Sequence, residues 1–180
     1  MANFYGQYVG FGAGESAPPY EAWEGAGESY GFIAAANPDT GATLTRIEKL
    51  SFASGTEDAT DSGVDTIDNS TNGVQRTSVV SSPTNGYFMG GFYAGPEPLY
   101  SDTDVVQRFS FAATSGTTTD IANLTVSRMM NVGLNSTTYG YSCGGTTYEA
   151  GYENNPFYTI DKIQFSSDST TSGHGDLSTY

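Results

Sequence analysis

A repeat of about 55 residues is the feature of this sequence that most restricts its fold. Three Gly-aromatic segments begin 55 and then 54 residues apart: YGFIAAA (30–36), NGYFMGG (85–91) and YGYSCGG (139–145). A second segment follows each of them: RIEKLSFAS (46–54), VVQRFSFAA (105–113) and TIDKIQFSS (159–167). A unit of this length cannot bury its apolar side chains alone and needs neighbouring units. The sequence therefore predicts a repeat architecture.

Each unit contains about four short segments rich in aromatic and β-branched residues, separated by Gly, Asn, Asp, Ser and Thr. No segment keeps an apolar period of 3.6 residues long enough for a stable helix. The 13 Tyr and 10 Phe supply apolar surface, and the 23 Gly suit the turns between short strands. We therefore expect an all-β fold made of four-stranded blades of the β-propeller type.

The chain divides into a leader, 1–29, and a repeat domain, 30–180, with units 30–84, 85–138 and 139–180. Because closed propellers have about four to eight blades, nearly three units do not close a ring. Either the N-terminal segment completes the last blade and protomers combine, or the blades stack openly or in an assembly. Since an exposed edge strand promotes aggregation, we expect it to pair with another chain, giving a homo-oligomer.

Glycines and basic residues recur at fixed positions in the units. Glycine pairs suit a place where strands crowd a central channel. Recurring cations in so acidic a chain predict bonds to carboxylates or strand-end carbonyls. A ring of cations that binds an anion in a channel is the alternative. The glycines are Gly86, Gly90, Gly91, Gly140, Gly144 and Gly145, and the cations are Lys49, Arg108 and Lys162 at one position and Arg76 and Arg128 at another.

The charge of the chain argues against two classes of partner. Twenty acidic residues face six basic ones, which gives a formal net charge of -14. Such a chain repels phosphate backbones and anionic lipid headgroups, so we expect no nucleic-acid binding and no membrane insertion. The opening residues have neither a basic stretch nor an unbroken apolar run, and they predict no signal peptide and no membrane span.

The residues that carry enzyme chemistry are scarce. His174 is the only histidine and lies in the turn-like SGHGD, while Cys143 is the only cysteine and occupies the position of Ala34 and Met89 in the other units. A position that accepts Ala, Met and Cys is a packing position, and no GxSxG elbow is present. We expect a protein that is not an enzyme and has no cofactor. Asp58, Asp61 and Asp65 form a weak calcium candidate, with a solvated acidic loop as the alternative.

The segments IDKIQFSSDSTTSGHGDLS (160–178) and STTYGYSCGG (136–145) resemble the kelch-like repeats of marine cyanophage proteins. The opening MANFYGQYVGFGAG (1–14) is similar to the N-terminal segment of several such proteins. The first unit departs from the family because it lacks the GG pair and has a longer acidic insertion. The resemblance implies a virion protein in a tail fibre, an appendage or a capsid decoration, with other virion proteins as partners.

Two hypotheses of function follow. The first is a non-enzymatic virion structural protein that self-associates by strand pairing through its aromatic leader, unless the leader completes the chain's own last blade. Its assembly candidates are Phe4, Tyr5, Tyr8, Phe11 and Trp23. The alternative is a carbohydrate- or host-receptor-binding module, because variable loops on a repeated frame often carry recognition. Its candidate ligand residues are Tyr93, Tyr100, Tyr148, Tyr152 and Tyr158.

Overall fold

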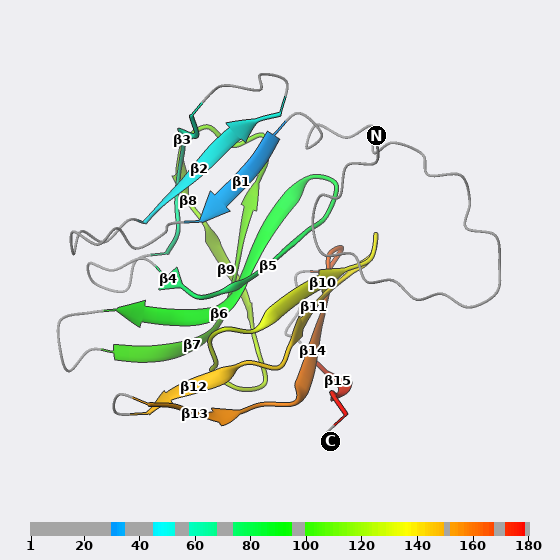
Figure 1. The fold of residues 1–180 in the computed structure, drawn as a ribbon. Coiled ribbons are helices and arrows are strands. Elements are labelled where there is room, and N and C mark those ends of the chain that lie inside the picture. The colour runs from blue at the N-terminus through cyan, green and yellow to red at the C-terminus, as the bar shows by residue number, and fades with distance from the viewer. Residues whose placement is uncertain are drawn as a thin grey trace, which may run out of the picture.

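A computed structural model describes residues 30–34, 45–52, 58–67, 74–94, 100–149, 152–167 and 172–178. Strands and the turns between them make up these ranges, and no helix occurs in them (Figure 1). The predicted all-β fold is therefore confirmed. Within the same ranges, no helical segment has the length and apolarity needed to cross a lipid bilayer.

The first sheet has the strand order β1-β2-β3-β8. It contains β1 (Tyr30–Ala34), β2 (Arg46–Ser51), β3 (Thr60–Asp65) and β8 (Gly116–Thr117). The first three strands are antiparallel neighbours, whereas β8 pairs with β3 in parallel. The Gly-aromatic segment thus forms β1, and the segment with the basic residue forms β2, with Lys49 opposite Phe32.

The second sheet is centred on the long hairpin of β6 (Asn85–Ala94) and β7 (Tyr100–Ser110). On one side, β4 (Val74–Gln75) and β5 (Ser78–Ser81) pair with successive halves of β6, and on the other β9 (Thr119–Asn123) pairs with β7. The edge breaks at Arg76, with φ 55°, where β6 carries Gly90 and Gly91 at φ 66° and 118°. These positive φ values explain the glycine pair, because side chains rarely adopt them.

The third sheet repeats this pattern with the order β10-β11-β14-β15. Its strands are β10 (Val132–Asn135), β11 (Tyr139–Cys143), β14 (Thr159–Gln164) and β15 (Ser172–Asp176). Beyond the pair Gly144 and Gly145, at φ 62° and 107°, β12 (Thr146–Glu149) and β13 (Tyr152–Pro156) form a separate hairpin.

The strand register defines which residues are equivalent in the three sheets. The aromatic residue after the glycine stands opposite the basic residue in each: Phe32 opposite Lys49, Tyr87 opposite Arg108, and Tyr141 opposite Lys162. The sheets cut across the sequence units. The strand β5 ends unit 30–84 yet pairs with β6, and β10 ends unit 85–138 yet pairs with β11.

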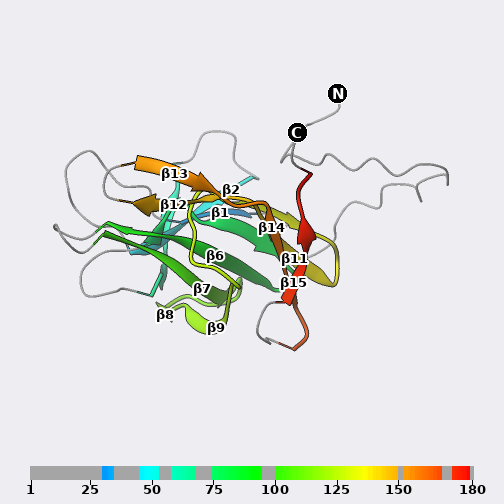
Figure 2. The same ribbon diagram turned by 90° about the horizontal axis from the view of Figure 1, so that it is seen from below.

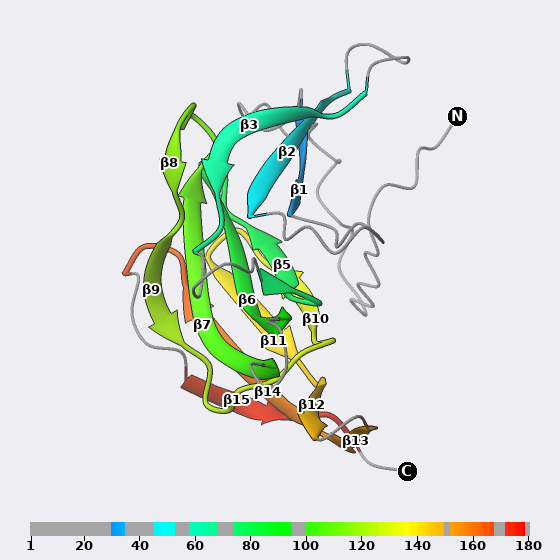
Figure 3. The same cartoon turned by 90° about the vertical axis from the view of Figure 1, so that its left-hand side faces the viewer.

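The three sheets follow one another, with the second in the middle (Figure 3). Because successive side chains of a strand point to opposite faces, β6 contributes to two cores. Phe88 lies with Ile47, Val64 and Phe109 between the first and second sheets. On the opposite face, Tyr87 and Met89 belong to a second cluster, whose other buried members are Val80, Val106, Ala122, Leu124 and Ile163. In Figure 2, β6 and β7 cross the middle of the molecule, and β14 and β15 lie to their right.

Candidate functional site

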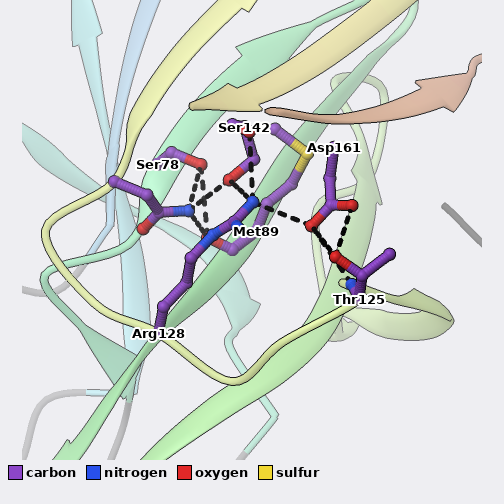
Figure 4. Close-up of polar contacts among 7 residues, drawn as sticks. Ser78, Met89, Thr125, Arg128, Ser142 and Asp161 are labelled. Carbon is purple, nitrogen blue, oxygen red and sulfur yellow. Dashed lines mark hydrogen bonds and ion pairs between the residues drawn. The ribbon is translucent and has the colours of Figure 1, made fainter. Parts of the chain in front are cut away.

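A buried ion pair connects the second sheet's exit segment to the third sheet. Arg128, between β9 and β10, approaches Asp161 of β14 with an Nη2–Oδ2 distance of 2.8 Å, and both side chains are 0% exposed. Thr125 donates to the same carboxylate from its hydroxyl, at 2.8 Å from Oδ1, and from its backbone N–H, at 3.1 Å from Oδ2 (Figure 4). Because a buried charge is stable only when paired, this contact fixes the two sheets relative to each other.

The ion pair belongs to a larger polar network. Arg128 Nη2 also donates to the carbonyl oxygen of Ser142, at 3.1 Å, and to its hydroxyl, at 3.2 Å. Asn131 Nδ2 donates to the hydroxyl of Ser78 and to the carbonyl of Met89, both at 3.0 Å. The network therefore joins β5 and β6 of the second sheet to β11 and β14 of the third (Figure 4).

The electrostatics of this network favour a structural role for its charged groups. Burial lowers the pKa of Arg128, and the neighbouring Asp161 carboxylate opposes that change. Burial also raises the pKa of the Cys143 thiol, with Arg128 opposing it, so the thiol remains protonated at neutral pH. Arg128 is paired and has no exposed surface, which removes it from any set of cations lining an open channel.

An equivalent contact joins the first sheet to the second. Gln107 precedes Arg108 in β7 as Asp161 precedes Lys162 in β14. Its Oε1 accepts the backbone N–H of Ile67, at 2.8 Å, and the hydroxyl of Thr118, at 2.6 Å. Ile67 lies two residues after the end of β3, and Thr125 lies two residues after the end of β9. The two contacts between sheets are therefore equivalent. The residue before the basic position accepts a hydrogen bond from the exit segment of the preceding sheet.

Aromatic pairs also recur between the sheets. Tyr87 of β6 stacks on Phe165, with ring centroids 4.9 Å apart and an interplanar angle of 26°. Phe32 of β1 stacks on Phe111 in the same way, at 5.0 Å and 12°. In each pair the aromatic residue opposite a cation contacts the anchor phenylalanine of the next sheet.

The recurring cations divide into different environments. Lys49 Nζ lies 3.7 Å from the ring centroid of Tyr30, and Lys162 Nζ lies 3.7 Å from that of Tyr139. These are cation–π contacts, in which the positive charge interacts with the face of the ring. The expected carboxylate partner is found for Arg128. In the second sheet, Arg108 stands opposite Tyr87 in the strand register.

Arg76 and Arg128 do not share one structural position. Arg76 and Met130 both have φ 55° and both lie two residues before an edge strand, so they are the equivalent pair. Arg128 lies two residues earlier than Met130. Arg76 instead donates from Nη1 to the sulfur of Met129, at 3.5 Å, and lies 5.8 Å from the ring centroid of Phe92.

Close contacts explain the glycines of β6 and β11. A Cβ atom at Gly86 would lie 2.3 Å from Cε1 of Phe109, and one at Gly140 would lie 2.7 Å from Cγ2 of Val80. At Gly90 and Gly145, a Cβ atom would meet the backbone oxygens of Arg128 and Met129, each at 2.7 Å. The approach at Gly86 is to its partner on the neighbouring strand β7, the one at Gly140 is between two sheets, and those at Gly90 and Gly145 are to the segment between β9 and β10, so packing requires all four glycines.

An aromatic groove of about 200 Å³ lies between β1 and the second sheet. Its aromatic walls are Tyr30, Phe32, Phe88, Phe109 and Phe111. The surface is apolar, with Ser81 as its one hydroxyl-bearing side chain apart from Tyr30. Sugars need several hydrogen-bond partners, so this groove suits apolar side chains better than a carbohydrate.

The tyrosines proposed for ligand binding lie in different environments. The Tyr93 side chain is 6% exposed, so it is not available to stack on a sugar. The Tyr148 ring lies 4.9 Å from that of Phe92, and its N–H donates to Asp102 Oδ2 at 2.6 Å. Tyr158 is 44% exposed. The strands β7 and β13 begin at Tyr100 and Tyr152, whose side chains lie outside the described part of the structure.

The remaining candidates are three acidic residues and the aromatic residues of the leader. Asp58, Asp61 and Asp65 are exposed; Asp61 accepts the N–H of Gly63, and Asp65 accepts the hydroxyl of Thr45. Among the described residues, no group of three or more His, Cys, Asp or Glu side chains is placed to hold a metal ion. The assembly candidates Phe4, Tyr5, Tyr8, Phe11 and Trp23 lie outside the described residues.

Several residues of the network were not identified from the sequence: Thr125, Asn131, Ser142, Asp161 and Gln107. One signal was available, because the residue before the basic position is Glu48, Gln107 or Asp161, and each of these has a side-chain oxygen acceptor. The backbone N–H groups that bind this acceptor come from segments more than 30 residues away, Ile67 for Gln107 and Thr125 for Asp161. No local pattern indicates them.

Comparison with solved structures shows that this fold has been seen before. The chain is similar to the structure titled "Structure of YjhT", with a TM-score of 0.64 and 13% sequence identity over 84% of this chain. It is also similar to a fungal alcohol oxidase of the AA5 family in complex with copper, with a TM-score of 0.54 and 12% identity over 75% of this chain. The chain spans 49% of the first structure and 28% of the second. No protein-family model matches the sequence, and no curated protein does.

These similarities correct one expectation from the sequence. The chain was expected not to be an enzyme because residues that carry enzyme chemistry are scarce in it. One of the two solved structures named above is an alcohol oxidase in complex with copper. Scarce His and Cys therefore gave no sound reason to exclude catalysis, since the same fold is compatible with it.

Proposed function

We propose that this chain is a kelch-like β-propeller component of a phage particle, in a tail fibre, an appendage or a capsid decoration. The motifs IDKIQFSSDSTTSGHGDLS and STTYGYSCGG support the assignment to a virion by their resemblance to cyanophage repeats. The sheets support the blade architecture. In the second and third sheets, the same order of an edge strand, a Gly-aromatic strand, a basic strand and an outer strand recurs.

The observation that carries the blade proposal is the repeated contact between sheets. The N–H of Ile67 binds Gln107, and one sheet later the N–H of Thr125 binds Asp161. The aromatic pairs Phe32–Phe111 and Tyr87–Phe165 follow the same step. Blades related by a constant rotation make the same contact at every step, as these sheets do.

Purified phage particles provide the test of the virion assignment. We expect quantitative mass spectrometry of gradient-purified particles to find this chain in a fixed ratio to the major capsid protein. Cryo-electron microscopy of the same particles should place blade-like sheets at one defined part of the virion. The proposal is overturned if the chain is present in lysates of infected cells but is lost from particles during purification.

A second candidate is a carbohydrate- or host-receptor-binding module. It is favoured by the exposed ring of Tyr158 and by the hydrogen bond from Tyr148 to Asp102, which holds β12 beside β7. The ends of β6 and β7 thus lie near the β12–β13 hairpin (Figure 1). We expect Tyr158→Ala to abolish any binding seen on a glycan array, and an array without signal for the unchanged protein would remove this candidate.

A further inference from the structure

We infer that the outer face of the third sheet binds the outer face of the first sheet of a second copy of this chain. The inference rests on the proposed blade architecture and names the partner and the contact surfaces. It follows from the two inter-sheet steps already described. Each step joins one kind of face to another, and both kinds carry exposed apolar side chains at the two ends of the described structure.

The third sheet presents the face that covers the next sheet. Tyr141 is the equivalent of Tyr87, which is 0% exposed where it stacks on Phe165. Leu177 is the equivalent of Leu124. The N–H of Leu124 donates to the carbonyl of Asp104, four residues before Arg108, and the N–H of Leu177 donates to that of Tyr158, four residues before Lys162. Leu124 is 4% exposed in the interface, whereas Leu177 is 43% exposed.

The edge strand of the third sheet adds to this face. The equivalent strand β5 directs Ser78 and Val80 toward the third sheet, where Val80 contacts the site of Gly140. The equivalent residues of β10 are Val132 and Leu134, which are 53% and 48% exposed. Both are large apolar side chains, so the outer face carries exposed apolar surface of the kind that marks a protein interface.

The first sheet presents the complementary face. Phe52 is the equivalent of Phe165, and it is 57% exposed. Ile33, 46% exposed, is the equivalent of the buried Phe88 and Ser142. Glu48 is the equivalent of Gln107 and Asp161, and its side chain is 34% exposed beside Arg46. This sheet therefore carries the anchor ring, an apolar side chain and the acceptor that the other inter-sheet contacts use.

The two faces match in three contacts. Tyr141 would stack on Phe52 of the second copy, as Tyr87 does on Phe165. Leu134 would cover the site of Gly31, as Val80 covers Gly140. The N–H of Ser178, which follows Leu177, would donate to the Glu48 carboxylate, as Thr125 donates to Asp161. A third step of the same geometry thus needs no new kind of interaction.

A contact between two different faces closes into a ring when the rotation allows it. The described residues of each copy contribute three such sheets, so two copies contribute six, within the range of about four to eight blades in closed rings. We therefore infer a ring of two copies with two identical contacts.

Light scattering after size-exclusion chromatography tests the inference on the full chain. Buffer of about 0.5 M NaCl screens the repulsion between two copies, each with a net charge of -14. We expect the mass of two chains for the unchanged protein. Phe52→Asp and Leu134→Asp should each weaken association at least about 30-fold, as for a hot-spot residue. Val79→Asp, at a 51% exposed residue that lines the aromatic groove and belongs to neither end face, is the matched control and should leave the mass unchanged.

Mixing the two variants makes the test specific. Each variant keeps one face intact, so an equal mixture of Phe52→Asp and Leu134→Asp should form a pair through one contact. Recovery of that pair also shows that both variants are folded. A wild-type mass other than two chains, or a mixture that stays monomeric, overturns the inference. Neither result bears on the presence of the chain in particles, which the proposed function predicts separately.

Discussion

Asp161 of the third sheet accepts the backbone N–H of Thr125 at 3.1 Å, although the two residues are 36 positions apart and belong to different sheets. The same carboxylate accepts a hydrogen bond from Nη2 of Arg128. One buried acid therefore fixes the position of the segment that connects β9 to β10. At the contact between the first and second sheets, the uncharged Gln107 has the same role, because its Oε1 accepts hydrogen bonds from Ile67 and Thr118. The sheets are therefore joined by position-specific polar contacts as well as by their apolar cores.

Removal of one partner of the buried ion pair should be strongly destabilising. We expect Arg128→Met to lower the free energy of unfolding by about 3–5 kcal/mol, because it leaves the Asp161 charge buried and unpaired. Urea unfolding followed by circular dichroism measures this change. The double variant Arg128→Met/Asp161→Leu should recover most of the loss, since Nε and Nη1 of Arg128 have no hydrogen-bond partner in the described structure. A double variant as unstable as the single one would contradict this account.

The Cys143 thiol should make stability depend on alkaline pH. Its pKa is raised by burial, so the folded state favours the protonated thiol. This contribution is fully present below the unfolded pKa of about 8.5 and is lost as pH rises toward the higher folded value. We expect the free energy of unfolding to fall less between pH 7 and pH 10 for Cys143→Ala than for the unchanged protein. Equal slopes for the two proteins would show that the thiol does not contribute.

The positive φ of Met130 should make glycine favourable there. Its φ is 55°, a conformation that costs a residue with a Cβ atom about 1 kcal/mol or more. We expect Met130→Gly to raise the free energy of unfolding by up to about 1 kcal/mol, in part offset by the greater freedom of glycine in the unfolded chain. Val79→Gly in β5 is the control and should lower it by about 0.5–1 kcal/mol. Thermal unfolding of the two variants should therefore shift in opposite directions.

Addition of a methyl group at Gly86 should disturb the core between the first two sheets. Its Cβ would lie 2.3 Å from Cε1 of Phe109, a ring that is 5% exposed. We expect Gly86→Ala to cost about 1–3 kcal/mol, because the ring must move within a filled core. Gly173→Ala in β15 meets no atom within 4 Å and should be nearly neutral. Chemical denaturation of both variants checks the difference, and equal midpoints would argue against steric packing at Gly86.

The strands could be predicted where a short sequence motif recurs in each unit. The Gly-aromatic segments that begin at Tyr30, Asn85 and Tyr139 form β1, β6 and β11, since glycine and aromatic residues alternate on two faces of a strand. The placement of Arg76 and Arg128 failed for a related reason. Their distances from the next Gly-aromatic segment differ by two residues, and the backbone break that sets the register is at Arg76 and Met130.

The polar network could not be predicted in the same way. Asp161 is one of 20 acidic residues, and its place before Lys162 indicates an acceptor but not the residues that bind it. Its role arises because Thr125 and Arg128 reach it from another sheet. The aromatic pairs are similar, since Tyr87 and Phe165 meet only when consecutive sheets are placed face to face. Only when the strand register is known can the three units be aligned so that the polar contacts and the aromatic pairs occupy equivalent positions.

The staggered relation between sequence units and sheets has an evolutionary consequence. Because β5 and β10 are encoded at the end of one unit and pair within the next sheet, an in-frame duplication of one unit would supply a complete sheet wherever its breakpoints fall. The new sheet would inherit the acceptor, the anchor ring and the glycine pair of its template. Genes of this kind can therefore gain or lose whole sheets by recombination while both end faces keep their chemistry.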